Sequence, residues 1–240
     1  MKNAKPVPSL SAQIAEAIHS DIVDGRLLVG DRLPSEAELA EQHGVSRATV
    51  REALKRLAAQ SLIRTERGAF GGAFVHHLSY DEARAQQVTT STLLLGMNAV
   101  SFQVACEARY ALERSCTALA AARRSAAQLQ DMRAQIALQA DPALSDEAFC
   151  ASDVAFHRTL VDCAGNPVLS YHLAGSVEAM QPLMNMITFT TRSRAEIIGL
   201  HTHMVEGLEH RRAELVDSAL QALERYTVEL GATVLHARAQ

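Results

Sequence analysis

The chain has 240 residues, with 23 Lys and Arg against 27 Asp and Glu, so its formal net charge is −4. This length suits one large domain or two modest ones, and an apolar content of 48% excludes a disordered chain. No apolar stretch is as long as a membrane span, and the N-terminus lacks the apolar centre of a signal peptide, so we expect a cytoplasmic protein that does not contact the membrane. The four cysteines form no CxxC motif, which indicates reduced thiols.

Basic residues gather in one short segment. Between Ser46 and Arg67 there are six Lys or Arg and two Glu, whereas residues 77–240 hold 13 basic and 18 acidic residues. A compact basic patch in an otherwise acidic chain is typical of a nucleic-acid surface, although charge alone leaves an ordinary solvated helix face as an alternative. Glycine and proline become rare after Gly72. We therefore expect one domain over residues 1–76 and a second over residues 77–240.

The first domain is predicted to hold three helices followed by two short strands. An apolar stripe predicts a helix over residues 9–24. Ser35 and Glu38 form a capping box for a second helix, and Ser46, after the turn at Gly44, caps a third. Residues 62–65 and 73–76 are predicted strands around a glycine-rich turn. This order of elements is that of a winged helix-turn-helix.

The third predicted helix carries side chains suited to DNA. Arg47 and Arg51 lie one turn apart on its outward face, and a guanidinium can pair bidentately with a guanine edge or a phosphate. The N-terminus of this helix, capped by Ser46, favours a phosphate. At the hairpin tip, Arg67 stands beside Gly68, which is small enough for close approach to a groove or to the DNA backbone.

These motifs resemble the GntR superfamily of bacterial transcription regulators. The resemblance rests on the segments Gly30–Ala40 (GDRLPSEAELA), Gly44–Leu54 (GVSRATVREAL) and Gly68–Val75 (GAFGGAFV). It implies a homodimer that binds a palindromic operator in double-stranded DNA through Ser46, Arg47, Thr49, Arg51, Arg67 and Gly68. One position departs from the family pattern, because Ala37 stands where an arginine is common. A DNA contact from the second helix is therefore expected to be missing.

The second domain is predicted to be an all-helical bundle of six or seven helices, which makes the whole fold mainly α. Apolar stripes of helical period cover residues 81–95, 101–123, 125–139, 145–163, 168–190, 193–211 and 213–238. The domain resembles the all-helical (FCD-type) effector domain of the FadR-like branch of the superfamily. The supporting motifs are Arg109–Glu113 (RYALE), Asp153–His157 (DVAFH), Ala164–Pro167 (AGNP) and the region of His201.

Three inward polar residues form a candidate metal site. Asp153 and His157 are four residues apart and share a helix face, and an inward carboxylate must be paired or bind a metal. His201 shares a face with apolar residues, whereas His203 and His210 lie on the polar side of the same helix. A hydrogen bond between Asp153 and a histidine inside the bundle is the alternative to a metal.

The resemblance implies how such a metal would be held. The family set is one Asp and three His around zinc, nickel or a similar divalent ion, which places the metal on Asp153, His157 and His201. The position implied for the last histidine is Leu223, which has no ligand atom. Three ligands can still hold a metal whose shell water or an effector carboxylate completes, so bound metal and a metal-free cavity stay open as equal alternatives.

Two residues are candidates for binding an anionic effector. Arg109 can pair bidentately with a carboxylate, and the alternative is an ion pair with Glu113 one turn along the helix. The resemblance places Asn166 near the same site, although the Gly165–Pro167 segment is also typical of a simple helix break.

The sequence therefore predicts a ligand-responsive, DNA-binding transcription regulator, expected to be a repressor, whose helical domain senses a small organic acid. No catalytic residue is expected in this interpretation. The alternative is a metal-dependent hydrolase in which Asp153, His157 and His201 activate water, but it leaves residues 1–76 unexplained. A DNA-architectural protein without an effector is a third hypothesis, and it gives the inward polar residues no role.

Overall fold

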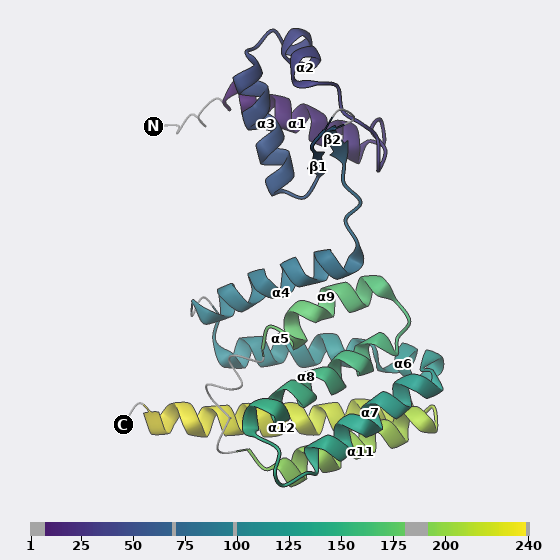
Figure 1. Ribbon diagram of the computed structural model, residues 1–240. Helices are drawn as coiled ribbons and strands as arrows, with labels where there is room; N and C mark the ends of the chain where they lie inside the picture. The colour runs from purple at the N-terminus through teal and green to yellow at the C-terminus, as the bar shows by residue number, and fades with distance from the viewer. Residues whose placement is uncertain (1–7, 69–70, 98–99, 181–191, 239–240) are drawn as a thin grey trace. The chain divides into compact units, whose positions relative to one another are not determined.

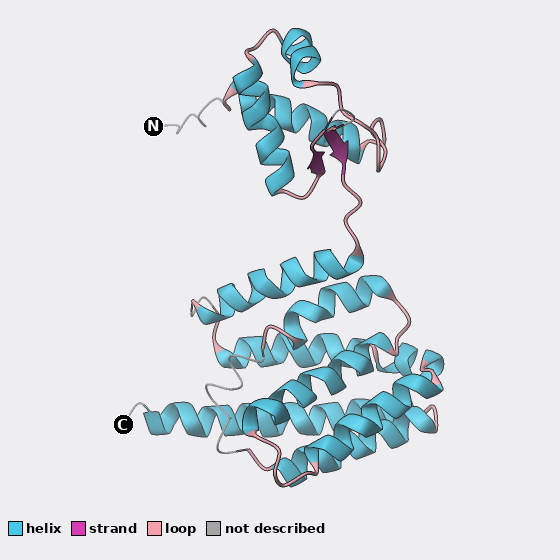
Figure 2. Ribbon diagram, in the orientation of Figure 1, coloured by secondary structure: helices cyan, strands magenta, loops and turns pink. Residues whose placement is uncertain are grey.

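The computed structural model describes residues 8–68, 71–97, 100–180 and 192–238. The chain divides into two compact units, residues 1–79 and residues 80–240. Helices dominate both units, and the described residues form one sheet of two strands (Figure 2). The mainly α class predicted from the sequence is confirmed. None of the helices in the described ranges is long and apolar enough to cross a membrane.

The N-terminal unit is a winged helix-turn-helix (Figure 1). Its elements are α1 (Leu10–Val23), α2 (Glu36–His43), α3 (Arg47–Ala59), β1 (Ile63–Glu66) and β2 (Gly72–Val75). The strands are antiparallel and pair Ile63 with Val75. Each strand lies one residue away from its predicted position.

Side-chain caps begin the helices of this unit where the sequence predicts them. Ser35 and Glu38 form both hydrogen bonds of a capping box at α2, and the hydroxyl of Ser46 accepts the amide of Thr49 at α3. Gly44 ends α2 with a φ of 63°, a left-handed conformation that glycine adopts without strain. The turn and both flanking helix ends are therefore set by local chemistry.

One face of α3 packs into the small core of the unit and leaves the other faces in solvent. Its buried residues are Val50, Ala53 and Leu57. The rest of this core comes from α1, the segment before α2, α2 itself and the hairpin: Ile14, Ala15, Ile18, Leu33, Leu39, Ala40, Ile63 and Val75. This packing fixes α3 by its apolar stripe and exposes its N-terminal turn.

The C-terminal unit is helical throughout its described residues. Its helices are α4 (Tyr80–Gly96), α5 (Phe102–Ser115), α6 (Thr117–Arg123), α7 (Ala126–Gln139), α8 (Asp146–Asp162), α9 (Pro167–Val177), α11 (Arg194–Glu209) and α12 (Ala213–Arg238). The helix predicted over residues 101–123 is two helices, since the chain turns at Cys116. The helix predicted over residues 168–190 ends at Val177, and residues 181–190 of that prediction lie outside the described part of the chain.

Six of these helices form a closed ring around one apolar core. Going round the ring, α5 packs on α12, α12 on α11, α11 on α7, α7 on α8, α8 on α9 and α9 on α5. Helix α4 lies outside the ring against α9 (Figure 1). The inner faces of α5, α7, α8 and α11 therefore meet in the middle of the unit, and all four contribute polar side chains there.

Candidate metal site and nucleic-acid interface

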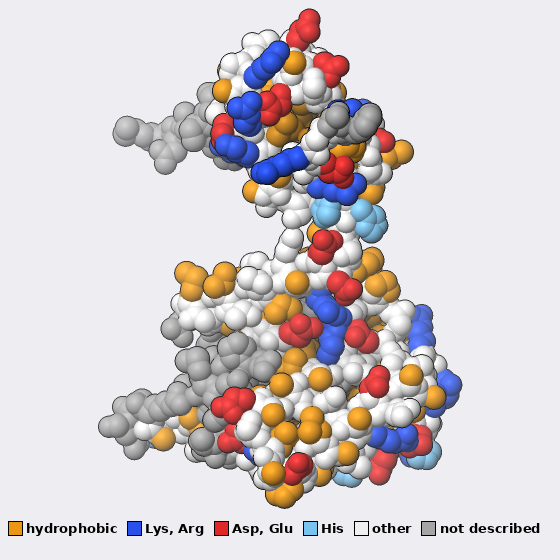
Figure 3. All heavy atoms as spheres, viewed as in Figure 1, with side chains coloured by type: hydrophobic (Ala, Val, Ile, Leu, Met, Phe, Trp, Pro, Cys, Tyr) orange, Lys and Arg blue, Asp and Glu red, His pale blue; other side chains and the backbone are white. Residues whose placement is uncertain are grey.

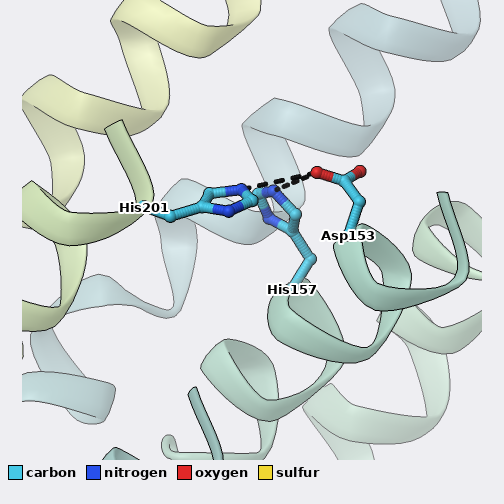
Figure 4. A group of neighbouring side chains, drawn as sticks. All are labelled: Asp153, His157 and His201. Atoms are coloured by element: carbon cyan, nitrogen blue, oxygen red, sulfur yellow. Dashed lines mark ion pairs between the residues drawn. The ribbon is translucent and has the colours of Figure 1, made fainter. Parts of the chain in front are cut away.

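The three predicted metal ligands come together inside the helical ring. Asp153 and His157 project from successive turns of α8, and His201 projects from α11 (Figure 4). The three side chains are at most 4% exposed, and their ligand atoms all lie within 4.8 Å of one another. An oxygen of Asp153 is 3.4 Å from Nε2 of His201 and 4.0 Å from Nε2 of His157. The arrangement is compact enough for one ion to touch all three.

The apolar pattern of two helices places these ligands. Helix α8 begins at Ser145, whose hydroxyl caps it, and buries Asp153 and His157 on the same face as Phe156. On α11, the buried stripe that contains His201 leaves His203 exposed. The inward direction of His201 and the solvated position of His203 agree with the sequence interpretation.

Each histidine ring is held by a hydrogen bond at Nδ1, the ring nitrogen that does not face Asp153. Nδ1 of His157 lies 2.6 Å from an oxygen of Glu113 on α5, and Nδ1 of His201 lies 2.8 Å from Oε1 of Gln139 on α7. The amide nitrogen of Gln139 donates to Ser152, which leaves its oxygen to accept from His201. Both rings therefore carry their proton on Nδ1 and turn Nε2 toward Asp153.

The ring of His201 is also held on its face. Phe156 stacks on it with ring centroids 3.9 Å apart and an interplanar angle of 16°. Burial lowers the pKa of His201, so its ring is neutral and Nε2 presents a lone pair. Contacts to both the edge and the face restrict the ring to one orientation.

Ionisation of Asp153 completes a donor set that suits a cation. Burial acts to raise the pKa of Asp153, but His201 and His157, when they carry a proton on Nε2, and the charge of Arg109 outweigh it and hold the pKa below its ordinary value. Within the described residues, Nε2 of His157 and Nε2 of His201 are buried and have no hydrogen-bond partner. A lone pair and a carboxylate oxygen 3.4 Å apart repel unless a proton or a metal ion lies between them. These residues therefore fit a divalent ion, and a hydrogen bond between Asp153 and His201 is the metal-free alternative.

The fourth position implied by the resemblance is apolar. Leu223 on α12 is 3% exposed and belongs to the main core of the unit. Among the described residues this cluster therefore offers one oxygen and two nitrogen ligands, which leaves room in the coordination shell for water or for a ligand group.

Arg109 is fully buried beside this cluster and already has a partner. Its Nε donates to an oxygen of Glu113 at 2.6 Å, and its guanidinium lies 5.1 Å over the ring of Tyr110. Burial acts to lower the pKa of Arg109, yet the charge of Glu113 keeps the pKa above its ordinary value. The ion pair weighed as an alternative in the sequence analysis is present, and the effector contact of Arg109 stays a prediction.

Asn166 acts as a cap in the structure. Its side-chain oxygen accepts the amides of Val168 at 3.0 Å and Leu169 at 3.3 Å, at the start of α9. The preceding Gly165 has a φ of 56°. These contacts support the helix-break interpretation of this segment, and a contact from Asn166 to an effector remains a prediction.

Sequence reasoning missed Glu113 and Gln139 as parts of the site. Glu113 was considered only as the ion-pair partner of Arg109, although its spacing of three from Tyr110 and seven from Cys106 places it on the same helix face as these apolar residues, which α5 buries. Gln139 stands at the end of α7, where the sequence gives no comparable signal. Both act on residues far away in the chain, and only the packing of the ring brings them together.

The predicted DNA contacts lie on the surface of the N-terminal unit. Ser46 and Thr49 share a hydroxyl contact of 2.9 Å at the start of α3, and Arg47 is exposed next to them. Arg51 is also exposed but pairs with Glu36 of α2 through contacts of 3.1 Å and 2.7 Å. Figure 3 shows several basic side chains on this unit with acidic ones among them. The surface is therefore more mixed in charge than the sequence count suggests.

The wing has a tight glycine turn. Arg67 is exposed beside Gly68, whose φ of 113° favours glycine. A Cβ atom at Gly71 would clash with the backbone oxygen of Glu66. Arg32 donates to the carbonyl oxygen of Gly71 at 2.6 Å and ties this turn to the rest of the unit. Arg67 is therefore exposed at the end of the hairpin that follows β1.

Two family models match the chain. The model described as "Bacterial regulatory proteins, gntR family" matches residues 10–75, and the model described as "FCD domain" matches residues 105–225. The first match covers the three helices and the hairpin of the N-terminal unit. The second includes every residue of the buried cluster.

Relatives and a solved structure agree with these matches. The "Putative L-lactate dehydrogenase operon regulatory protein" of Escherichia coli (strain K12) is 32% identical over 176 residues, which are 72% of this chain and 65% of that protein. The "HTH-type transcriptional regulator LutR" of Bacillus subtilis (strain 168) is 32% identical over 163 residues, 66% of this chain and 69% of that protein. The structure of "Streptococcus agalactiae GntR" superposes with a TM-score of 0.58 at 21% identity, over 93% of this chain and 99% of that chain, which supports the fold.

Proposed function

Because the chain belongs to the gntR family of bacterial regulatory proteins and carries an FCD domain, we propose that it is a DNA-binding transcription regulator controlled by a small organic acid. In this proposal the N-terminal unit binds an operator, and the helical unit binds the acid at a divalent metal ion. The two units then carry separate tasks, recognition of DNA and recognition of the effector.

The exposed N-terminal turn of α3 supports the DNA-binding part. Arg47 and Arg51 extend into solvent within the first two turns, and a helix N-terminus attracts phosphate. A homodimer would place two such helices on a palindromic operator, with Arg67 of each wing beside the DNA. We expect the operator to be occupied without the acid and released with it, as in a repressor.

One observation supports the metal-binding part, the convergence in a buried cluster of a carboxylate and two Nε2 atoms that form no hydrogen bond within the described part of the chain. Asp153, His157 and His201 would hold the ion. A bound divalent ion supplies Lewis acidity, with which it can bind the carboxylate of an effector. The residues Glu113 and Gln139 keep both imidazoles in the orientation that this requires.

Charge indicates which acids would fit. Metal binding requires both histidines to be deprotonated at the ligating nitrogen, so the charged side chains of the site are those of Arg109, Glu113 and Asp153. Together they carry one negative charge, and a divalent ion changes this sum to one positive charge. A monocarboxylate then neutralises the site, whereas a dicarboxylate leaves a buried negative charge, which is costly. The name of the E. coli relative refers to an L-lactate dehydrogenase operon, so 2-hydroxy acids of the size of lactate are the first compounds to test.

DNA binding is tested by fluorescence anisotropy with a duplex selected from a random library by the full-length protein. Arg47→Ala and Arg51→Ala are each expected to weaken binding by about 1–3 kcal/mol. Arg212→Ala is the matched control, because Arg212 is as exposed as Arg51, pairs with a glutamate in the same way, and lies in the other unit. Wild-type affinity in both α3 variants would contradict the DNA-binding proposal.

The effector is tested in the same assay. Lactate, glycolate and pyruvate are added to the protein–DNA complex with and without zinc, and succinate and citrate serve as dicarboxylate and tricarboxylate controls. Release of DNA by a monocarboxylate only when zinc is present supports the proposal. Release that is equal with and without zinc, or that is caused by the multivalent acids alone, contradicts it.

A further inference from the structure

Glu113 links Arg109, the candidate effector-binding residue, to His157, a candidate metal ligand, through its two carboxylate oxygens. One oxygen lies 2.6 Å from Nε of Arg109, and the other lies 2.6 Å from Nδ1 of His157. The side chain is 0% exposed. A buried carboxylate is costly to desolvate unless both oxygens are paired, and here each oxygen has one partner.

The two histidines of the cluster differ in the acceptor behind them. His157 donates to an ionised carboxylate, whereas His201 donates to the neutral amide oxygen of Gln139. Glu113 forms an ion pair of 2.6 Å with the permanently charged guanidinium of Arg109, which favours its carboxylate form. An ionised acceptor makes an imidazole a stronger donor to a metal than a neutral one does.

Arg109 holds Glu113 in this position. The guanidinium contacts Glu113 within one helical turn and is itself packed over Tyr110, so moving the carboxylate to another partner would break an ion pair whose two side chains are both buried. The orientation of the carboxylate, and through it that of His157, is therefore tied to Arg109.

We propose that Glu113 is a positioning residue that sets the metal affinity of the site by fixing and polarising His157. The proposal rests on the metal site of the proposed function. It assigns no metal contact to Glu113, and it distinguishes the two histidine ligands, of which His157 contributes more to affinity than His201.

The experiment measures the affinity of the full-length protein for Zn²⁺ by competition with a chromophoric chelator, together with the visible absorption of bound Co²⁺. Glu113→Gln keeps the shape and can still accept the proton of His157, but it removes the charge. It is expected to weaken zinc binding by roughly 10- to 100-fold and to shift the Co²⁺ bands. The thermal stability of the metal-free variant is recorded as well, because a purely structural role would lower it without changing metal affinity.

The matched control is Arg114→Gln, which breaks an ion pair of the next residue on α5 with Asp217 of α12 at 2.8 Å. It is expected to leave zinc affinity unchanged. The double variant Glu113→Gln with Gln139→Glu moves the carboxylate from behind His157 to behind His201, and it is expected to recover part of the lost affinity. Should Glu113→Gln fail to fold, Gln139→Glu alone provides the converse test, with zinc binding expected to tighten by roughly tenfold.

Two negative outcomes are distinguishable. Zinc and cobalt binding by the wild type, with an affinity that Glu113→Gln changes less than about twofold, would overturn the role of Glu113 and leave the metal site intact. No binding of either ion by the wild type would overturn the metal site of the proposed function, and the role of Glu113 with it.

Discussion

Two arginine–glutamate pairs of similar geometry lie in the two units and differ in burial. Arg51 and Glu36 are 2.7 Å apart with side chains 57% and 37% exposed, whereas Arg109 and Glu113 are 2.6 Å apart with side chains 1% and 0% exposed. In water such a pair contributes little and either partner can exchange for another ion, but inside the protein each partner depends on the other. Burial, rather than pair geometry, therefore decides which charge is available to a binding partner.

The largest expected difference between the buried pair and the exposed pair is in their contribution to the free energy of unfolding. Glu113→Ala leaves Arg109 buried without its carboxylate and is expected to lower the free energy of unfolding by about 3–5 kcal/mol. Glu36→Ala breaks the exposed pair and is expected to lower it by less than about 1 kcal/mol. Urea denaturation of the metal-free proteins measures both, and equal losses would show that burial does not separate the two pairs.

The pH dependence of the free energy of unfolding gives a second difference between buried and exposed groups, here two histidines of α11. The folded-state pKa of His201 lies below its unfolded value, so the unfolded state takes up the proton first as the pH falls. The free energy of unfolding should then decrease below about pH 6.5, by up to about 1.4 kcal/mol per pH unit for this group. His201→Asn should flatten this decrease in protein kept metal-free with a chelator.

The control for that experiment is His203→Asn. His203 lies on the same helix and is exposed, so its replacement should leave the pH dependence unchanged. If His201→Asn and the wild type lose stability equally between about pH 7 and pH 5, the buried neutral state of His201 is wrong.

The smallest expected effect concerns the exposed pair and DNA. Glu36→Gln releases Arg51 and removes a negative charge close to α3, so DNA affinity at low salt should rise by roughly threefold to tenfold. The matched control is Glu214→Gln, which releases Arg212 in the other unit and should have no effect. Unchanged or weaker DNA binding by Glu36→Gln would mean that Arg51 remains with Glu36 on DNA.

The helix starts could be predicted because their causes are local. In the described part of the chain, seven serines each cap a helix with their own hydroxyl, and seven of the ten predicted helices began at them: Ser9, Ser35, Ser46, Ser101, Ser125, Ser145 and Ser193. The break at Cys116 could not be predicted, because the apolar stripe continues across it and no glycine or proline marks it.

The candidate site, too, could be predicted from the sequence only where the causes are local. Asp153 and His157 could be paired from the sequence because four residues make one helical turn, and His201 was found from its apolar neighbours on α11. The hydrogen bonds of Glu113 and Gln139 to the two histidines join different helices across the ring. Such contacts depend on how the helices pack, and no periodicity within one helix contains that information.

The most direct test of the buried site is the metal content of the full-length protein purified without a histidine tag. One divalent ion per chain is expected to remain after dialysis, and Asp153→Asn is expected to lose it. Added zinc should stabilise the wild type by about 2.7 kcal/mol at a concentration 100 times its dissociation constant. A wild-type protein that contains no metal and gains no thermal stability from zinc, nickel or manganese would contradict the metal site.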